Sequence, residues 1–174
     1  ENEGVLAVSS TGENIVGLHN FRLKGQDEDA IQGNWVNSDL HIIKGIKVPK
    51  PTLEGIRRLK NSDIVKSGEN LKVLNMSELT FLAAELPYDL ERNPKAPLWH
   101  HLGVGMFNEQ LHMYEERIRN NYYDLVLFEY IPDLNNFFPF AIRDALKSYY
   151  KQVDDFDAPR SGPRPGTIEV YLRK

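Results

Sequence analysis

The stretch YYDLVLFEYIP, residues 122 to 132, contains an almost unbroken apolar run that stops at a proline. NLKVLNMSEL, residues 70 to 79, is a second short run of this kind and follows a Ser-Gly-Glu turn. Short apolar runs between turn residues are typical of strands that are buried on both faces of a sheet. We therefore expect these two segments to be the central strands of the fold.

Segments with helical spacing of apolar residues alternate with these strands. They are residues 51 to 65, which open with a proline suited to helix entry, residues 109 to 121, with Asn108 as the expected N-cap, and LNNFFPFAIRDALKSYYKQV. Parallel strands need a crossover connection of about a dozen residues or more, usually a helix. The order therefore predicts an α/β fold with a three-layer, Rossmann-like and mostly parallel sheet.

The two ends of the chain differ from this central pattern. YKQVDDFDAP and TIEVYLRK flank the turn RSGPRPG, which predicts a C-terminal antiparallel hairpin at a sheet edge. Residues 1 to 50 contain short β-prone pieces, GVLAVSS, NIVGLHNFRL and LHIIKGIKV. At 174 residues the chain fits one domain, with residues 1–50 as a β-rich cover and residues 51–174 as the wound core.

The composition excludes several classes of function. A net charge of −4 creates no positive field to attract nucleic acid. The absence of cysteine excludes disulfides, thiolate nucleophiles and thiolate metal sites. The apolar runs are too short to cross a bilayer, and the first residues show neither a basic n-region nor an apolar h-region. Because the chain starts at Glu1 rather than a methionine, we expect it to be a piece of a longer protein.

Two glutamates lie at the carboxyl ends of the predicted central strands. Glu78 follows the first strand and Glu129 closes the second. Ligands of wound α/β sheets bind beyond these strand ends, and two carboxylates facing one cleft can divide acid and base roles between them. The simpler interpretation, that each is a solvated strand-end charge or a helix cap, is favoured.

The segment PLWHHLGVGMFNEQLHMYEE, residues 97 to 116, contains three histidines and a tryptophan. His100 and His101 are adjacent, and His112 follows eleven residues later, so their spacing matches metal ligands on neither a strand nor a helix. We expect no metal and no cofactor. Trp99, among several prolines, is a candidate platform for a sugar ring or a partner chain, or else a hydrophobic lid over the sheet.

The order of segments resembles a known family over residues 68 to 174. The segments are VLNMSELTFLAAELPYDLERNPKAPLWHHLG, NNYYDLVLFEYIP, SYYKQVDDFDAP and TIEVYLRK. They are similar to the soluble tail domain that follows the transmembrane helices of bacterial membrane-embedded glycosyltransferase-like proteins. The resemblance implies an accessory domain on the extracytoplasmic face of a bacterial membrane. In that family the chemistry is attributed to acidic loops among the membrane helices, so no catalytic residue is transferred to this chain.

Two main functions compete, and a third possibility, a purely structural interaction domain, would predict an exposed apolar patch and no pocket. The first is a non-catalytic accessory or recognition domain whose partners are a parent transmembrane region, another protein, a saccharide or a lipid-linked sugar, but not nucleic acid. Its candidate binding residues are Glu78, Trp99, His100, His101 and Glu129. The alternative is a small α/β enzyme that acts on a sugar or similar polar ligand. Paired carboxylates about 5 to 10 Å apart in a concave pocket would favour the enzyme.

Overall fold

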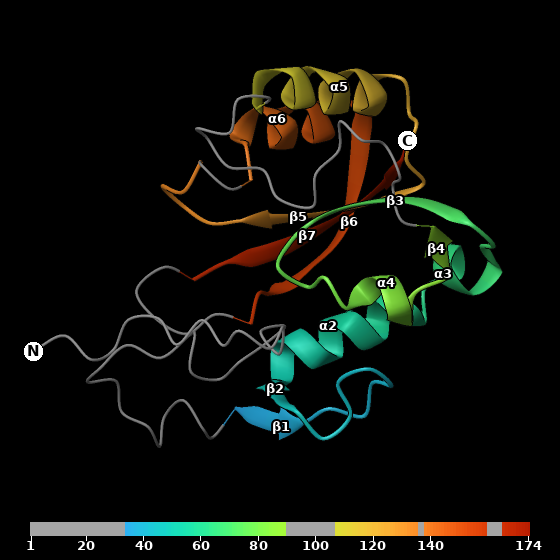
Figure 1. The fold of residues 1–174 in the computed structure, drawn as a ribbon, viewed down its shortest axis with the longest axis vertical. Coiled ribbons are helices and arrows are strands. Elements are labelled where there is room, and N and C mark those ends of the chain that lie inside the picture. The colour runs from blue at the N-terminus through green and yellow to red at the C-terminus, as the bar shows by residue number, and fades with distance from the viewer. Residues whose placement is uncertain (1–33, 90–106, 136–137, 160–164) are drawn as a thin grey trace, which may run out of the picture.

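The computed structural model describes residues 34–89, 107–135, 138–159 and 165–174. These residues form a mixed α/β structure with one larger sheet and one two-stranded ribbon (Figure 1). The strands are β1 (Trp35–Asn37), β2 (Lys47–Pro49), β3 (Leu71–Met76), β4 (Tyr88–Asp89), β5 (Leu125–Tyr130), β6 (Tyr150–Asp157) and β7 (Thr167–Arg173). The helices are α2 (Lys50–Lys60), α3 (Asp63–Ser67), α4 (Leu82–Glu85), α5 (Phe107–Arg119) and α6 (Phe140–Tyr149).

The larger sheet has the order β4-β3-β5-β7-β6, with the two-residue β4 at one edge. The two apolar runs are β3 and β5, which lie side by side and run parallel, from Val73 opposite Leu125 to Met76 opposite Phe128. The expected pair of adjacent central strands is therefore confirmed. Their carboxyl ends lie at the same edge of the sheet.

The C-terminal hairpin is also confirmed, since β6 and β7 pair antiparallel and β6 forms the other edge. The expectation of a mostly parallel sheet is wrong. β7 pairs antiparallel with both β5 and β6, whereas only the β3–β4 and β3–β5 pairs are parallel. The reason is the hairpin connection, because a short turn can only return the chain in the opposite direction. The sheet is mixed, and the Rossmann-like arrangement is not established.

Two hydrophobic cores lie on opposite faces of this sheet and share β5. Figure 1 shows α2 on one face of the sheet and α5 and α6 on the other. Leu125 and Leu127 belong to the core on the α2 side, whereas Val126 and Phe128 belong to the core on the side of α5 and α6. All four side chains are 0% exposed. A strand covered on both faces needs apolar residues at every position, which explains the unbroken run in the sequence.

The segment predicted as one helix over residues 51 to 65 is two helices, α2 and α3. The break lies at Asn61 and Ser62. The Ser62 hydroxyl donates to the carbonyl of Leu59 at 2.6 Å, whereas the backbone N–H of Asn61 still donates to the carbonyl of Arg57 as a residue at the end of α2 does. Asparagine and serine favour helix ends because their side chains compete for backbone hydrogen bonds.

The boundaries of α5 also differ from the expectation. The helix starts at Phe107, so Asn108 lies within it and not before it, as the predicted N-cap would. The C-terminal end of α5 agrees better with the sequence, because an asparagine follows it. Asn121 adopts φ 53°, a left-handed conformation that asparagine tolerates and that ends a helix. The chain then turns into β5.

The predicted N-terminal strands are mostly outside the described residues. Of LHIIKGIKV, only the last residues belong to a strand, β2, and residues 38–46 form a loop between β1 and β2. Gly45 adopts φ 80° and its amide donates to the Ser38 carbonyl at 2.8 Å. A positive φ suits glycine and interrupts an extended strand, so the apolar run 40–46 folds as a closed loop.

Candidate functional site

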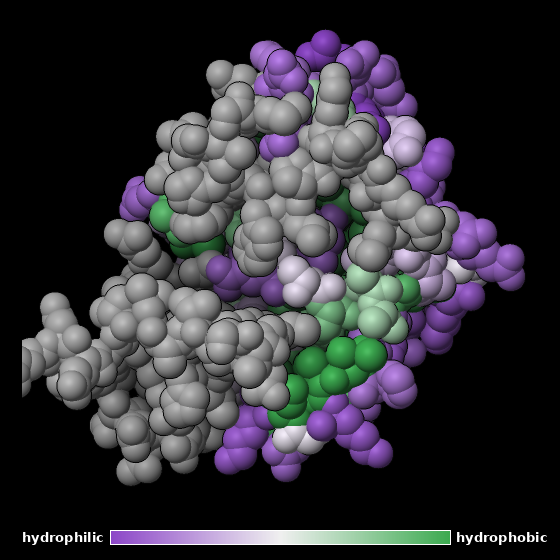
Figure 2. All heavy atoms as spheres, viewed as in Figure 1, coloured by the Kyte–Doolittle hydropathy of each residue, from purple (hydrophilic) through white to green (hydrophobic). Residues whose placement is uncertain are grey.

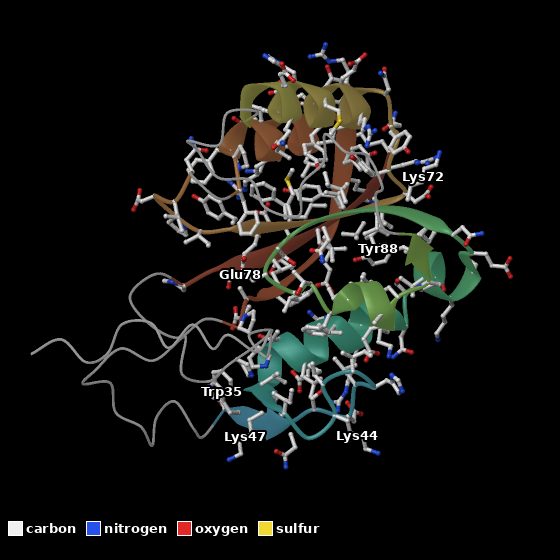
Figure 3. All side chains as sticks on the ribbon, in the orientation of Figure 1. Trp35, Lys44, Lys47, Lys72, Glu78 and Tyr88 are labelled. Carbon is white, nitrogen blue, oxygen red and sulfur yellow. The ribbon has the colours of Figure 1, made fainter. Side chains whose placement is uncertain are left out.

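The carboxyl ends of β3 and β5 meet beside the turn that connects β3 to α4. Side chains of this turn hold its shape. Ser77 donates to Oδ1 of Asn75 at 2.5 Å and accepts from the Leu79 amide at 3.2 Å. The Asn75 side-chain nitrogen donates to the Leu79 carbonyl at 3.0 Å. Glu78 lies in this turn (Figure 3) and is half-buried.

Glu129 faces this turn from β5. It lies on the same face of the strand as Leu125 and Leu127, and it is 0% exposed. The backbone N–H of Glu78 donates to Oε2 of Glu129 over 3.3 Å, which is at the long end of the range for hydrogen bonds. The structure thus brings Glu78 and Glu129 together at the predicted edge. The contact it forms ties a buried carboxylate to the backbone of the turn.

The other candidate binding residues, Trp99, His100 and His101, lie outside the described residues. His112 is described and lies on α5 with 80% of its side chain exposed, 3.5 Å from Glu115. Within the four described ranges, no group of three or more histidines, aspartates or glutamates could hold a metal ion. The binding roles of the three residues stay predictions.

A polar cluster that the sequence analysis did not predict lies on the opposite face of the sheet. Arg143, on α6, donates to both carboxylate oxygens of Glu169, on β7, with the shortest distance 2.6 Å. The Tyr171 hydroxyl donates to the same carboxylate at 2.6 Å. The Arg143 guanidinium lies 3.8 Å from the centre of the Tyr130 ring. These four residues link α6 to β5 and β7.

Two groups of this cluster, Arg143 and Tyr171, hold their protons more tightly than usual. The hydrogen bond to Glu169 raises the pKa of Arg143 above its usual value. Burial, and then the hydrogen bond to Glu169, raise the pKa of the Tyr171 hydroxyl. Neither of these two groups exchanges a proton near neutral pH, so neither is suited to act as a general acid or base there.

The sequence does contain a signal for this cluster. In TIEVYLRK, Ile168 and Val170 alternate with Glu169 and Tyr171, so the latter pair must lie on the other face of the strand. If that face is also covered by helices, Glu169 becomes a buried carboxylate that needs a cation. Our sequence analysis treated this segment as an edge hairpin, in which one face can be solvated, and so missed it.

Comparison of the chain with models of protein families, with curated proteins and with solved structures found no match. The resemblance to glycosyltransferase tail domains therefore stays a prediction. Among the described residues, no helix combines the length and the apolar composition needed to span a bilayer.

Proposed function

We propose that this chain is a non-catalytic recognition or accessory domain of a larger protein. The observation that carries the proposal is the state of Glu129. A catalytic carboxylate must reach its substrate, but this one is 0% exposed and accepts the Glu78 amide. Glu129, the strand carboxylate of the predicted crevice, thus holds the turn after β3 in place.

The membrane-bound, glycosyltransferase-like parent protein and the extracytoplasmic location belong to this proposal through the sequence resemblance alone. A Rossmann-like relationship belongs to it as well. The parallel β3–β5 pair and the helices on both faces support that relationship, whereas the antiparallel β6–β7 half departs from it. The loop from 87 to 108, which contains Trp99, His100 and His101, is the proposed contact surface for a partner protein or a saccharide, because its aromatic residues and prolines can hold a fixed shape at little entropy cost on binding.

The alternative is an enzyme that acts on a sugar. The observation in its favour is the contact between the backbone N–H of Glu78 and the Glu129 carboxylate, which places both residues at one edge of the sheet. Opening of the turn after β3 would be needed before a substrate could contact Glu129.

A turnover experiment separates the two functions. The 174-residue chain is incubated with a panel of nitrophenyl glycosides and oligosaccharides, together with Glu78→Gln, Glu129→Gln and Glu54→Gln. Glu54 is the matched control, because it is an exposed carboxylate on α2. We expect no product release by any form, and a lower unfolding midpoint for Glu129→Gln only. Turnover that persists in Glu54→Gln and disappears in folded Glu129→Gln would establish the enzyme instead.

A further inference from the structure

The loop between β1 and β2 exposes two large apolar side chains beside lysines. We name residues 41–47, with the sequence HIIKGIK, the basic-apolar loop. Ile42 is 44% exposed and Ile46 is 41% exposed, and both Lys44 and Lys47 are exposed. Figure 3 shows the two lysines at the end of the molecule away from the five-stranded sheet. Figure 2 shows an apolar area at this end, bordered by hydrophilic residues.

The basic-apolar loop is held in place from below, so the exposure of its isoleucines is built into the fold. Leu40 and Ile43 are 3% and 2% exposed and belong to the core. The Ile42 amide donates to Oε1 of Glu85 at 2.7 Å, and the Ser38 amide donates to the Ile46 carbonyl at 2.8 Å. Ile43 of the loop and the preceding Leu40 thus face inward, whereas Ile42 and Ile46 face outward. The outward pair loses little conformational entropy on binding.

The charge around the loop is positive. From Leu40 to Lys50 the chain has three lysines and no acidic residue. The adjacent Asp39 carboxylate lies 2.9 Å from the Arg57 guanidinium, and the Glu85 carboxylate lies 2.7 Å from the Lys60 ammonium. The nearby acids are therefore neutralised by other cations. The lysines of the loop present a net positive edge to anything that covers the two isoleucines.

Apolar side chains within a basic border fit an anionic lipid surface. Isoleucines gain by burial among the acyl chains near the headgroups, while lysines gain by proximity to the negatively charged lipid phosphates. Trp35, which is half-buried, lies on the same side of the β1–β2 ribbon as Lys47. Tryptophan is enriched at the membrane–water interface.

We propose that the basic-apolar loop docks this chain onto an anionic lipid surface, with Ile42 and Ile46 inserted between headgroups and Lys44 and Lys47 against the phosphates. This docking uses residues that the proposed function does not use. It stands whether the strand-end carboxylates are structural or catalytic.

Co-sedimentation with vesicles tests the docking. The 174-residue chain is mixed with vesicles of phosphatidylcholine alone, or of equal parts phosphatidylcholine and phosphatidylglycerol. We expect binding to the mixed vesicles that weakens with added salt, and at least tenfold weaker binding to phosphatidylcholine. Ile42→Ser/Ile46→Ser and Lys44→Gln/Lys47→Gln should each weaken binding to the mixed vesicles by at least tenfold. Both double variants change exposed side chains, so their unfolding midpoints should stay close to that of the wild type.

The matched control is Lys151→Gln/Val153→Ser on β6, where Val153 is 46% exposed. This variant should bind vesicles as the wild type does. Equal binding by Ile42→Ser/Ile46→Ser and the wild type would overturn the proposal. A wild-type chain that binds neither kind of vesicle would also overturn the proposal. A chain that binds no lipid but self-associates, and that loses this self-association in Ile42→Ser/Ile46→Ser, would overturn it as well, because the loop would then be a protein interface.

Discussion

Arg143 and Glu169 form an ion pair whose side chains are only 22% and 6% exposed. Removing one partner of a buried pair leaves the other charge without compensation, which costs about 3 to 5 kcal/mol. We therefore expect Arg143→Met to lower the free energy of unfolding by roughly this amount in urea titrations. Arg143→Met/Glu169→Leu should recover much of the loss, because no charge is then left buried.

The exposed pair between Arg58 and Asp154 provides the control for that experiment. Its side chains are 52% and 31% exposed, and pairs of this kind contribute about 1 kcal/mol or less. Arg58→Met should therefore change stability far less than Arg143→Met. Equal losses from the two substitutions would mean that the Arg143 pair contributes no more than a surface contact.

Glu85 gives the molecule an acid-sensitive contact. Its carboxylate is 2% exposed and accepts hydrogen bonds from Lys60 and from the Ile42 amide, each at 2.7 Å. Burial acts to raise the pKa of Glu85, but these hydrogen bonds outweigh it and the pKa is lowered. A carboxyl whose pKa is lower in the folded chain stabilises the fold fully above its unfolded pKa. That contribution is lost as the pH falls through the folded value.

We therefore expect Glu85→Gln to be less stable than the wild type at pH 7, with a difference that shrinks as the pH falls below the ordinary glutamate pKa of about 4.3. Unfolding in urea at a series of pH values measures this difference. Glu54→Gln, at an exposed carboxylate on α2, is the control and should change stability at pH 7 far less than Glu85→Gln. A difference for Glu85→Gln that stays constant into acid would contradict the assignment.

Helix α2 packs against β6 through a glycine. A Cβ added at Gly55 would overlap the ring of Phe156, so any larger residue must push the helix away from the strand. Replacing glycine by alanine within a helix ordinarily stabilises it by about 0.5 to 1 kcal/mol, whereas overpacking a core costs about 1 to 3 kcal/mol. We expect overpacking to dominate and Gly55→Ala to lower the midpoint of thermal unfolding. Gly55→Ala/Phe156→Leu should restore part of the loss. A Gly55→Ala variant that is more stable than the wild type would show that Gly55 and Phe156 are not closely packed.

At the level of elements, the sequence predicts those strands and turns that are determined by residues close together in the chain. β3 and β5 are recognisable because burial on both faces leaves an apolar run. The hairpin is recognisable because Gly and Pro separate two β-prone segments. The break between α2 and α3 was missed, because the apolar spacing continues across Asn61 and Ser62 and predicts one helix. Close packing such as that of Gly55 against Phe156 joins residues a hundred positions apart and has no local signal.

At the level of the whole molecule, neither the directions of the strands nor the polar cluster around Arg143 and Glu169 could be predicted from the sequence. The segment after RSGPRPG was expected at an edge, but β7 lies between β5 and β6 and is buried on both faces. That position converts Glu169 from a solvated residue into the buried partner of Arg143. Glu78 and Glu129 were found together because their proximity follows from adjacent parallel strands alone. The chemistry of that edge could not be predicted, since burial of Glu129 depends on how the turn after β3 closes.

The two cores on either side of β5 lead to a prediction about cooperativity. Ile56 on α2 is 1% exposed in one core, and Ile142 on α6 is 0% exposed in the other. Because neighbouring residues of β5 belong to opposite cores, neither layer can lose its packing without exposing the strand that supports the other. Ile56→Ala and Ile142→Ala should each cost about 2 to 5 kcal/mol and shift one single transition in urea, with an unchanged slope.

Val153→Ala, at an exposed position on β6, controls for the effect of truncating a branched side chain and should cost well under either core substitution. Coincident unfolding curves from tryptophan fluorescence and far-UV circular dichroism are expected for all three variants. Two separate transitions in Ile56→Ala or in Ile142→Ala would contradict the prediction. They would mean that the layer on one face of the sheet unfolds while the other persists, and that the chain behaves as two cooperative units joined along β5.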